Sequence, residues 1–361
     1  MRKRYIDNLR WAILLILVPY HAAMAYNVWG EPNYITLEGS RTLSSFIVFF
    51  SPFFMPLLFA LAGVSAHHSL EKRTVGKFIK ERVKRLLIPF AFGTIVLMPI
   101  MTYIADRFNC GYDGGFLRHY GIFFTKFTDL TGADGGFSVG QFWFLLYLFV
   151  VSLAGVGLVA LIEKLRRNER QPMPFPVVIG MGLMLALVGG ALSIGGKSLI
   201  EYLFFFMVGY YALSDDEPVE KLEKHCWPLL AIGLAASALD IYLFIWSGKE
   251  LPLLNDAAKY VAEWFMVLAL VGLAKRYLDF GGKASEYMSA RSFLFYTWHF
   301  IWVVFFQYIF YPICGTSVAV YYAFTAVLSY IMTFACCEVC ARVPLLCFLT
   351  GTKYVKKSEQ V

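Results

Sequence analysis

The chain has 361 residues, of which 59% are hydrophobic and 16% are charged, and its formal net charge is +7. Soluble domains carry about 25% charged residues, so this composition excludes an ordinary soluble enzyme. The apolar residues form blocks of roughly 20, which is the length that a helix needs to cross a bilayer. The positive charge is concentrated in the loops between these blocks, which indicates membrane topology and not a nucleic-acid partner.

The apolar blocks predict about ten transmembrane helices, and we expect an all-α, polytopic integral membrane helix bundle with one domain over residues 1–361. Basic loops lie near residues 71–85, 163–170 and 275–291. All three face the cytoplasm if both termini lie inside, so we predict an N-in, C-in topology. The predicted spans are about 9–27, 44–67, 86–105, 140–162, 175–194, 198–213, 226–246, 257–274, 291–311 and 317–340.

The seven cysteines show no spacing that is typical of a metal site. The cluster "CCEVC" (Cys336 to Cys340) falls within a predicted span, where cysteine behaves as a small apolar residue. We therefore expect no metal and no permanently bound cofactor.

Two polar residues interrupt the first span, "DNLRWAILLILVPYHAA" (Asp7 to Ala23). Arg10 and His21 are eleven residues apart, about 20° from three full turns of a helix, so both project from one face, roughly 16 Å apart along the axis. Asp7 lies close to the same face. Ionisable groups within a span usually face a polar interior, which makes all three residues candidates for a functional site.

Each of these residues also has a structural interpretation. Arg10 could extend to the inner headgroups, as long basic side chains do near helix ends. His21 is too deep and too short for that, but it could be a hydrogen-bonded packing residue. The sequence alone leaves both alternatives open.

A second basic element, "FIKERVKRLLIP" (Phe78 to Pro89), precedes the third span. Arg82 and Arg85 are three residues apart and would share one face of a helix at the inner mouth of that span. Arginine forks bind phosphate well, so a phosphate site is one interpretation. Simple topogenic charge is the other.

Further polar residues lie within later spans. His299 is roughly 12 Å in from Arg291, and Glu338 is near the inner end of the last span. We interpret His299 as an inner-pore partner and Glu338 as a ligand for a basic residue. With Asp240, Glu263 and Gln307 in other spans, they suggest a polar path through the bundle.

A neutral histidine near mid-membrane can act as a general base toward a hydroxyl group. Arginines at the inner mouth suit a phosphate-bearing donor such as an acyl-coenzyme A (acyl-CoA). Aromatic and acidic residues at the outer mouth suit a sugar, although the aromatic residues could equally form an ordinary interfacial belt. These outer residues are Trp29, Tyr34, Trp143, Glu201 and Trp264.

The order of these elements resembles the acyltransferase family 3 membrane O-acyltransferases over nearly the whole chain. An arginine and a histidine separated by ten residues in the first span are similar to the signature of that family, and Arg82 and Arg85 match its Arg-x-x-Arg element. Other similar segments are "SPFFMPLLFALAGVSA" (Ser51 to Ala66), "QFWFLLYLFV" (Gln141 to Val150), "YLFFFMVGYYA" (Tyr202 to Ala212) and "SFLFYTWHFIW" (Ser292 to Trp302).

Within the family, "VPYHAAMAYN" (Val18 to Asn27) and "CARVPLLCFLTGTK" (Cys340 to Lys353) resemble the glucans biosynthesis protein C group, which succinylates periplasmic glucans. The resemblance implies transfer of an acetyl or succinyl group from cytoplasmic acyl-CoA to a hydroxyl of an extracytoplasmic carbohydrate or glycan. It also implies a bacterial cytoplasmic (inner) membrane, with membrane lipid around the protein.

On this interpretation His21 is the base that activates the hydroxyl, or it briefly carries the acyl group. Arg10 orients the donor or neutralises charge on the thioester oxygen. Arg82 and Arg85 then hold the phosphates of coenzyme A. The alternative from another class is a transporter or flippase for a polar lipid or sugar. It would use the same buried charges without an acyl donor.

Overall fold

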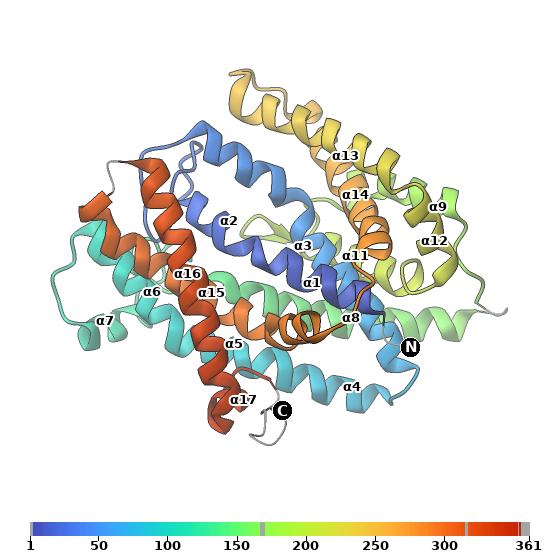
Figure 1. The fold of residues 1–361 in the computed structure, drawn as a ribbon, viewed down its shortest axis with the longest axis horizontal. Helices are drawn as coiled ribbons and strands as arrows, with labels where there is room; N and C mark the ends of the chain where they lie inside the picture. Colours follow the sequence, from blue (N-terminus) through green and yellow to red (C-terminus); the bar gives the residue numbers. More distant parts are fainter. Residues whose placement is uncertain (1–2, 167–169, 315–316, 353, 355–361) are drawn as a thin grey trace. The chain divides into compact units, whose positions relative to one another are not determined.

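The computed structural model describes residues 3–166, 170–314, 317–352 and 354. These residues are mainly helical (Figure 1). Within this described part, the strands are β1 (Ser193–Ile194) and β2 (Lys197–Ser198), a short antiparallel pair with Ser193 opposite Ser198. The predicted all-α fold class is therefore confirmed.

Seven helical stretches in the described ranges are long and apolar enough to cross a membrane. They are Arg41–Leu70, Val75–Cys110, Gly140–Leu165, Cys226–Trp246, Pro252–Tyr277, Lys283–Cys314 and Val318–Arg342. Each corresponds to one of the predicted spans, and six of them contain the whole predicted range. The stretch from Val75 begins well before the predicted residue 86, so most of the basic segment 71–85 is helix and not loop.

Three predicted spans are shorter or interrupted. The fifth consists of α9 (Phe175–Gly180), the 3-10 helix η5 (Met181–Met184) and α10 (Leu185–Val188). The sixth is α11 (Leu199–Tyr211). The first is divided into α1 (Arg4–Leu15) and α2 (Leu17–Met24).

The chain packs into two compact units, and each draws on separate parts of the sequence. The first unit comprises Met1–Ile13, Val48–Arg82 and Tyr147–Ser289. The second comprises Leu14–Ile47, Val83–Leu146 and Ala290–Val361.

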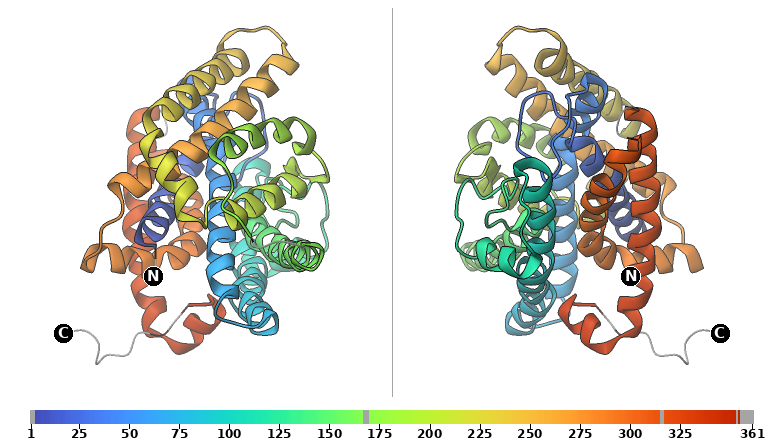
Figure 2. Two further views of the ribbon diagram at one scale, coloured as in Figure 1. Left: turned by 90° about the vertical axis from the view of Figure 1, so that its right-hand side faces the viewer. Right: turned by 90° about the vertical axis from the view of Figure 1, so that its left-hand side faces the viewer.

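In the first unit, α13 (Cys226–Ile241) and α14 (Pro252–Tyr277) lie side by side as an antiparallel hairpin (Figure 2). The π-helical turn η6 (Tyr242–Trp246) extends α13, and α12 (Asp216–Lys224) packs against α14. The unit also holds α4 (Val75–Arg82) and most of α8 (Trp143–Leu165).

Two glycines bring α3 (Arg41–Leu70) and α11 into backbone contact in the first unit. A Cβ atom on Gly63 would overlap the carbonyl oxygen of Phe206, and one on Gly209 would overlap that of Ala60. Small residues permit such close approach of membrane helices. Neither glycine can therefore be enlarged without separating the two helices.

The start of α1 is held by the buried amide of Asn8. Its Nδ2 donates to the carbonyl oxygens of Leu278 and Phe280 at 2.6 and 2.9 Å. Its Oδ1 accepts from Trp11 Nε1 at 3.0 Å and from Ser285 Oγ at 2.5 Å. This side chain thus satisfies its own hydrogen-bonding capacity in full. It fixes α1 against the end of α14, the segment after it and the first turn of α15 (Lys283–Cys314).

Arg170 joins several elements of the first unit. Its Nη2 binds both carboxylate oxygens of Asp215 at 2.9 Å and donates to Ser214 Oγ at 3.0 Å and to the carbonyl oxygen of Tyr211 at 3.1 Å. Its Nη1 lies 3.0 Å from Nδ1 of His67. The sequence indicated only a basic loop here, whereas this arginine ties the end of α3 to the end of α11.

The second unit contains three π-helical turns along one continuous stretch: η1 (Val83–Leu87), η2 (Gly93–Leu97) and η3 (Asp106–Cys110). They alternate with α5 (Ile88–Phe92) and α6 (Met98–Ala105). Pro89 and Pro99 follow the first two turns and lack the N–H group that an α-helix needs there, which accounts for the irregular backbone.

The second unit also contains α15 (Lys283–Cys314) from residue 290 onward and α16 (Val318–Arg342). It includes α2, the short α7 (Phe116–Phe123) and α17 (Pro344–Leu349), together with the 3-10 turn η4 (Gly140–Phe142).

Candidate functional site

His21 lies on α2 in an aromatic setting. Its ring stacks on Phe300 of α15, with 3.9 Å between centroids and 21° between planes. The ring of His299, one residue earlier on α15, is 5.3 Å away. His21 is half-buried, and neither of its ring nitrogens is hydrogen-bonded to a residue within the described ranges. A basic nitrogen is therefore available beside a wall of aromatic rings.

The local structure of α2 follows from Pro19. Proline has no N–H to donate to the carbonyl of Leu15, four residues earlier, so the helix breaks at Ile16. The hydroxyl of Tyr330 on α16 donates to that carbonyl at 2.6 Å, and Tyr322 donates to the carbonyl of Pro19 at 3.1 Å. Two tyrosines of α16 thus hold the backbone that carries His21.

A third donor reaches α2 from α15. Gln307 is buried, and its Nε2 donates to the carbonyl oxygen of Ala22 at 3.1 Å, next to His21. The backbone carbonyl of Gln307 accepts in turn from the hydroxyl of Tyr321 at 2.5 Å. The position of α2 is therefore set by neutral hydrogen bonds on both sides of His21.

His299 is fully buried. Its Nδ1 lies 2.7 Å from the carbonyl oxygen of Tyr296, and a carbonyl can only accept, so Nδ1 carries the proton. Nε2 then bears a lone pair and is without a hydrogen-bond partner in the described structure. The second unit thus brings together two predicted site residues, His21 and His299, as a pair of imidazoles.

The aromatic wall continues away from His21. Tyr34 meets Phe300 edge-on at 5.3 Å, and its hydroxyl lies 3.3 Å from Ser138 Oγ. Asn109 donates to the carbonyl oxygens of Asn33 and Ala133 at 2.9 and 2.8 Å, which ties the two connecting segments together. Of the outer aromatic residues that the sequence suggested, Tyr34 is thereby placed next to the histidine site.

Glu338, near the end of α16, lies between two arginines, one on α15 and one on α16. It accepts from Arg291 Nε at 2.8 Å and from Arg342 Nη2 at 3.1 Å. Arg291 is only 8% exposed. The carboxylate therefore compensates a buried guanidinium, as such a charge requires.

Arg10 belongs to the first unit. Its Nη1 donates to Asp7 Oδ1 at 3.1 Å and its Nη2 donates to Ser65 Oγ of α3 at 2.8 Å. The common helical face predicted for Arg10 and His21 assumed one unbroken α-helix. That assumption is wrong, because α1 ends at Leu15 and the two residues belong to different units.

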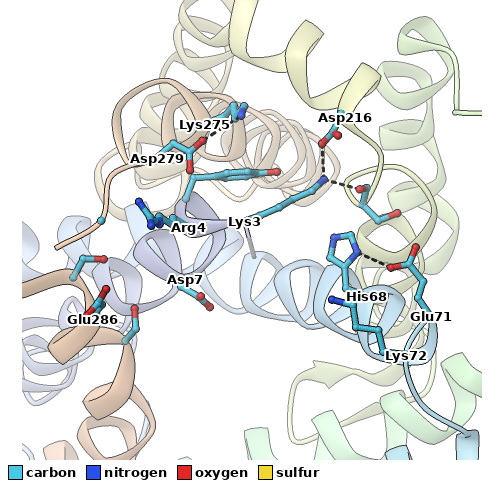
Figure 3. A pocket seen from close by; sticks show the side chains of 15 residues that line it. Lys3, Arg4, Asp7, His68, Glu71, Lys72, Asp216, Lys275, Asp279 and Glu286 are labelled. Carbon is cyan, nitrogen blue, oxygen red and sulfur yellow. Dashed lines mark hydrogen bonds and ion pairs between the residues drawn. The ribbon is translucent and has the colours of Figure 1, made fainter. Parts of the chain in front are cut away.

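Asp7 lines a polar cavity of about 950 Å³ within the first unit (Figure 3). Its walls carry opposite charges in pairs. Lys3 contacts Asp216 at 2.9 Å, Lys275 contacts Asp279 at 3.2 Å, and His68 contacts Glu71 at 3.2 Å. The other lining residues are Arg4, Tyr5, Lys72, Ser214, Gly281, Ser285, Glu286 and Ser289.

These pairs account for two pKa shifts near the cavity. The ammonium group of Lys3 donates to Asp216 and holds the pKa of that carboxyl below its usual value. The hydrogen bond from His68 likewise lowers the pKa of the Glu71 carboxyl. The cavity is thus rich in charged side chains, many of which are paired with a neighbour of opposite charge. Neither Arg82 nor Arg85 is among the described residues that line it.

Arg82 and Arg85 do not continue one α-helix. Arg82 is the last residue of α4 and lies over the ring of Phe78 at 4.6 Å, whereas Arg85 lies in the π-helical turn η1. The prediction of a shared face assumed α-helical geometry throughout and is wrong on that point. A π-turn changes the rotation between successive residues. Arg85 is exposed and Arg82 is half-buried.

His67, His68 and Glu71 bring potential metal ligands within 4.8 Å of one another in the first unit. Their spacing in the sequence did not single them out as metal ligands. The guanidinium of Arg170 lies 3.0 Å from Nδ1 of His67, so that nitrogen accepts a hydrogen bond. A metal on Nε2 would require a proton on Nδ1, facing the arginine. The arrangement therefore suits a hydrogen-bonded cluster better than a metal centre.

The remaining polar residues of the predicted path are distributed over both units. Asp240 accepts from Asn255 at 2.6 Å, and Glu263 is buried near Glu201, all within the first unit. Gln307 supports α2 in the second.

Comparison with known families places these observations in context. A family model described as an acyltransferase domain, that of acyltransferase family 3, matches residues 3–340. No match was found among curated proteins or solved structures. The family match covers nearly the whole chain, including α1, α2, α15 and all but the last residues of α16. The chain therefore belongs to acyltransferase family 3 and is a multi-pass membrane acyltransferase.

Proposed function

We propose that this protein is an O-acyltransferase that moves an acetyl or succinyl group from acyl-CoA to a hydroxyl of an extracytoplasmic carbohydrate. The observation that carries the proposal is the imidazole pair of His21 and His299, 5.3 Å apart between ring centroids, on a stacked aromatic wall. A neutral imidazole held in a largely apolar site is a suitable general base for a hydroxyl group.

In the proposed reaction, a ring nitrogen of His21 takes the proton of the acceptor hydroxyl while its oxygen attacks the thioester carbonyl. The resulting tetrahedral intermediate collapses and the carbon–sulfur bond breaks. The thiolate of coenzyme A leaves and recovers the proton from the imidazolium of His21. Acyl ester and free coenzyme A are the products, with no net gain or loss of protons.

Arg10 is the proposed positioning group for the donor, or the partner of the developing oxyanion. The ion pair with Asp7 and the hydrogen bond to Ser65 support this, because they fix the guanidinium beside Asp7, which lines a large polar cavity. We propose that this cavity is the aqueous approach for the donor. Arg82 and Arg85 remain the proposed contacts for the phosphates of coenzyme A.

The proposed acceptor is a glucan or related glycan, and the proposed location is a bacterial inner membrane with both termini in the cytoplasm. The likeness of Val18–Asn27 and Cys340–Lys353 to the glucan succinyltransferase group supports this. Membership of an acyltransferase family argues against the alternative of a transporter or flippase.

The test uses purified protein in detergent, incubated with acetyl-CoA or succinyl-CoA and a glucan acceptor. His21→Ala should lower kcat by about 10²–10⁴-fold, the usual contribution of a general base. His225→Ala is a matched control, because that exposed histidine at the start of α13 lies in the other unit. Retention of most activity in His21→Ala would exclude it as the base, and wild-type protein inert toward both donors would support the carrier instead.

A further inference from the structure

The C-terminal segment after α16 folds back onto the second unit. α16 ends at Arg342, and α17 (Pro344–Leu349) follows after Val343 and packs against α5. Cys347 is buried, and its Sγ lies 3.0 Å from the carbonyl oxygen of Cys340. The N–H of Thr352 donates to the carbonyl of Cys347 at 2.8 Å. The segment is therefore an ordered part of this unit up to the turn at Gly351.

Gly351 approaches the backbone of this unit closely. Its φ is +65°, in the left-handed region that favours glycine. A Cβ atom at this position would lie 2.9 Å from Cγ of Pro89, 3.1 Å from Cα of Arg85 and 3.2 Å from the carbonyl oxygen of Arg85. Both the backbone conformation and the available space therefore require glycine.

The surface under Gly351 is the backbone of η1, the π-helical turn that carries Arg85. Pro89 lacks the N–H that an α-helix would direct at the Arg85 carbonyl, so the backbone here departs from α-helical geometry. A change of one residue in helical register rotates a side chain by about 100°. The direction of the Arg85 side chain thus depends on keeping the π-turn, while that side chain itself stays exposed.

We propose that the turn at Gly351 is a positioning element for Arg85. It covers the backbone of Arg85 and Pro89, holds η1 in its π-helical form and so directs the Arg85 guanidinium toward the phosphates of the acyl-CoA donor. The inference rests on the proposed role of Arg85 in donor binding. The catalytic scheme assigns no role to the sequence pattern of Cys340–Lys353. The proposal gives its turn at Gly351 a role in positioning Arg85.

The test compares Gly351→Ala with Gly111→Ala. Gly111 has a similar φ of +71° and belongs to the same unit, but a Cβ there would meet no atom within 4 Å. Gly351→Ala should raise KM for acyl-CoA about tenfold, as expected when a charge-assisted hydrogen bond is lost. Its kcat and its KM for the acceptor should stay within about twofold, and all three parameters of Gly111→Ala should do so.

A second variant separates backbone strain from close approach. Asparagine tolerates the left-handed region, so Gly351→Asn should fold even if the alanine variant does not. Its Cβ would still press on Pro89 and Arg85, so the donor KM should again rise. A wild-type donor KM in Gly351→Asn would overturn the proposal, as would a loss of kcat without any change in donor KM.

Arg85→Ala, measured alongside, distinguishes this inference from the donor assignment. If Gly351 acts through Arg85, the double variant should have the donor KM of Arg85→Ala alone. A further rise in the double variant would overturn the positioning role and leave Arg85 as a donor ligand. An unchanged donor KM in Arg85→Ala would instead remove Arg85 from the donor site.

Discussion

The two units hold their polar groups in different ways. In the first, the described side chains around the cavity and the Arg170 cluster are mostly charged and closely matched, such as Lys3 with Asp216 and Arg170 with Asp215. In the second, the contacts that surround His21 are neutral, with tyrosine hydroxyls and an amide directed at backbone carbonyls. The charged pair of Arg291 and Glu338 lies away from His21, where the first third of α15 meets the end of α16.

This difference has a physical reason. Charges in a medium of low dielectric are tolerated when each is paired with an opposite charge. The fields of the two paired charges then largely cancel at other groups. Neutral hydroxyl and amide donors fix a helix without adding a field that would favour the protonated form of a nearby histidine. An arrangement of this kind keeps the imidazole nitrogens available for proton transfer.

The largest expected effect concerns Arg170. Arg170→Ala would leave Asp215 partly buried without its partner and remove the donors to Ser214 and Tyr211. We expect a loss of about 3 kcal/mol in the free energy of unfolding, measured by denaturation in one detergent. Asp215→Ala should cost much less in the Arg170→Ala background than in the wild type. Strictly additive losses would show that this unit does not depend on matched charges.

A smaller effect is expected for the hydroxyl that caps the Leu15 carbonyl. Tyr330→Phe removes that donor within the membrane region and should cost about 1–3 kcal/mol. In a Pro19→Ala background, the new N–H at residue 19 can bind the same carbonyl, so the cost of Tyr330→Phe should fall to a few tenths of that. The double-mutant cycle is measured by thermal unfolding. Equal costs in both backgrounds would contradict the neutral capping described for α2.

The smallest effect concerns pH. The pKa values of Asp216 and Glu71 are lowered from 3.8 and 4.5, respectively. A lowered carboxyl pKa contributes stability that is present above the ordinary value and is lost as pH falls through the folded-state value. Thermal stability should therefore decrease slightly between about pH 5 and pH 3. Asp216→Asn should flatten this decrease, and the same slope in both proteins would show that the Lys3–Asp216 pair contributes nothing.

The sequence predicted the helical fold because hydrophobic length is a strong signal for membrane helices. It also singled out His21 and His299, since a histidine is conspicuous in an apolar segment. It did not single out Asn8 or Arg170, because a polar residue at a helix end or in a basic loop looks ordinary until its partners are known. Those partners lie 270 residues from Asn8 and 45 from Arg170.

The local backbone geometry of the helices was harder to predict than their positions in the sequence. The periodicity used for Arg10 with His21, and for Arg82 with Arg85, assumed regular α-helix. Pro19 and Pro89 are the residues in the sequence that indicate a departure from regular helix. Each proline lacks the N–H group that would otherwise bind the carbonyl four residues earlier in an α-helix. The break at Ile16 and the π-turn at Val83–Leu87 follow from them.

The crossing of α3 and α11 at Gly63 and Gly209 has a mechanical consequence. Because the two backbones touch, neither helix can slide past the other without first moving apart, and a shift by one turn would bring side chains into the space that the glycines leave open. We therefore expect α3 and α11 to move together as one rigid body during catalysis. Conformational changes that admit a donor or release a product must take place in other elements, while this crossing keeps its length and angle.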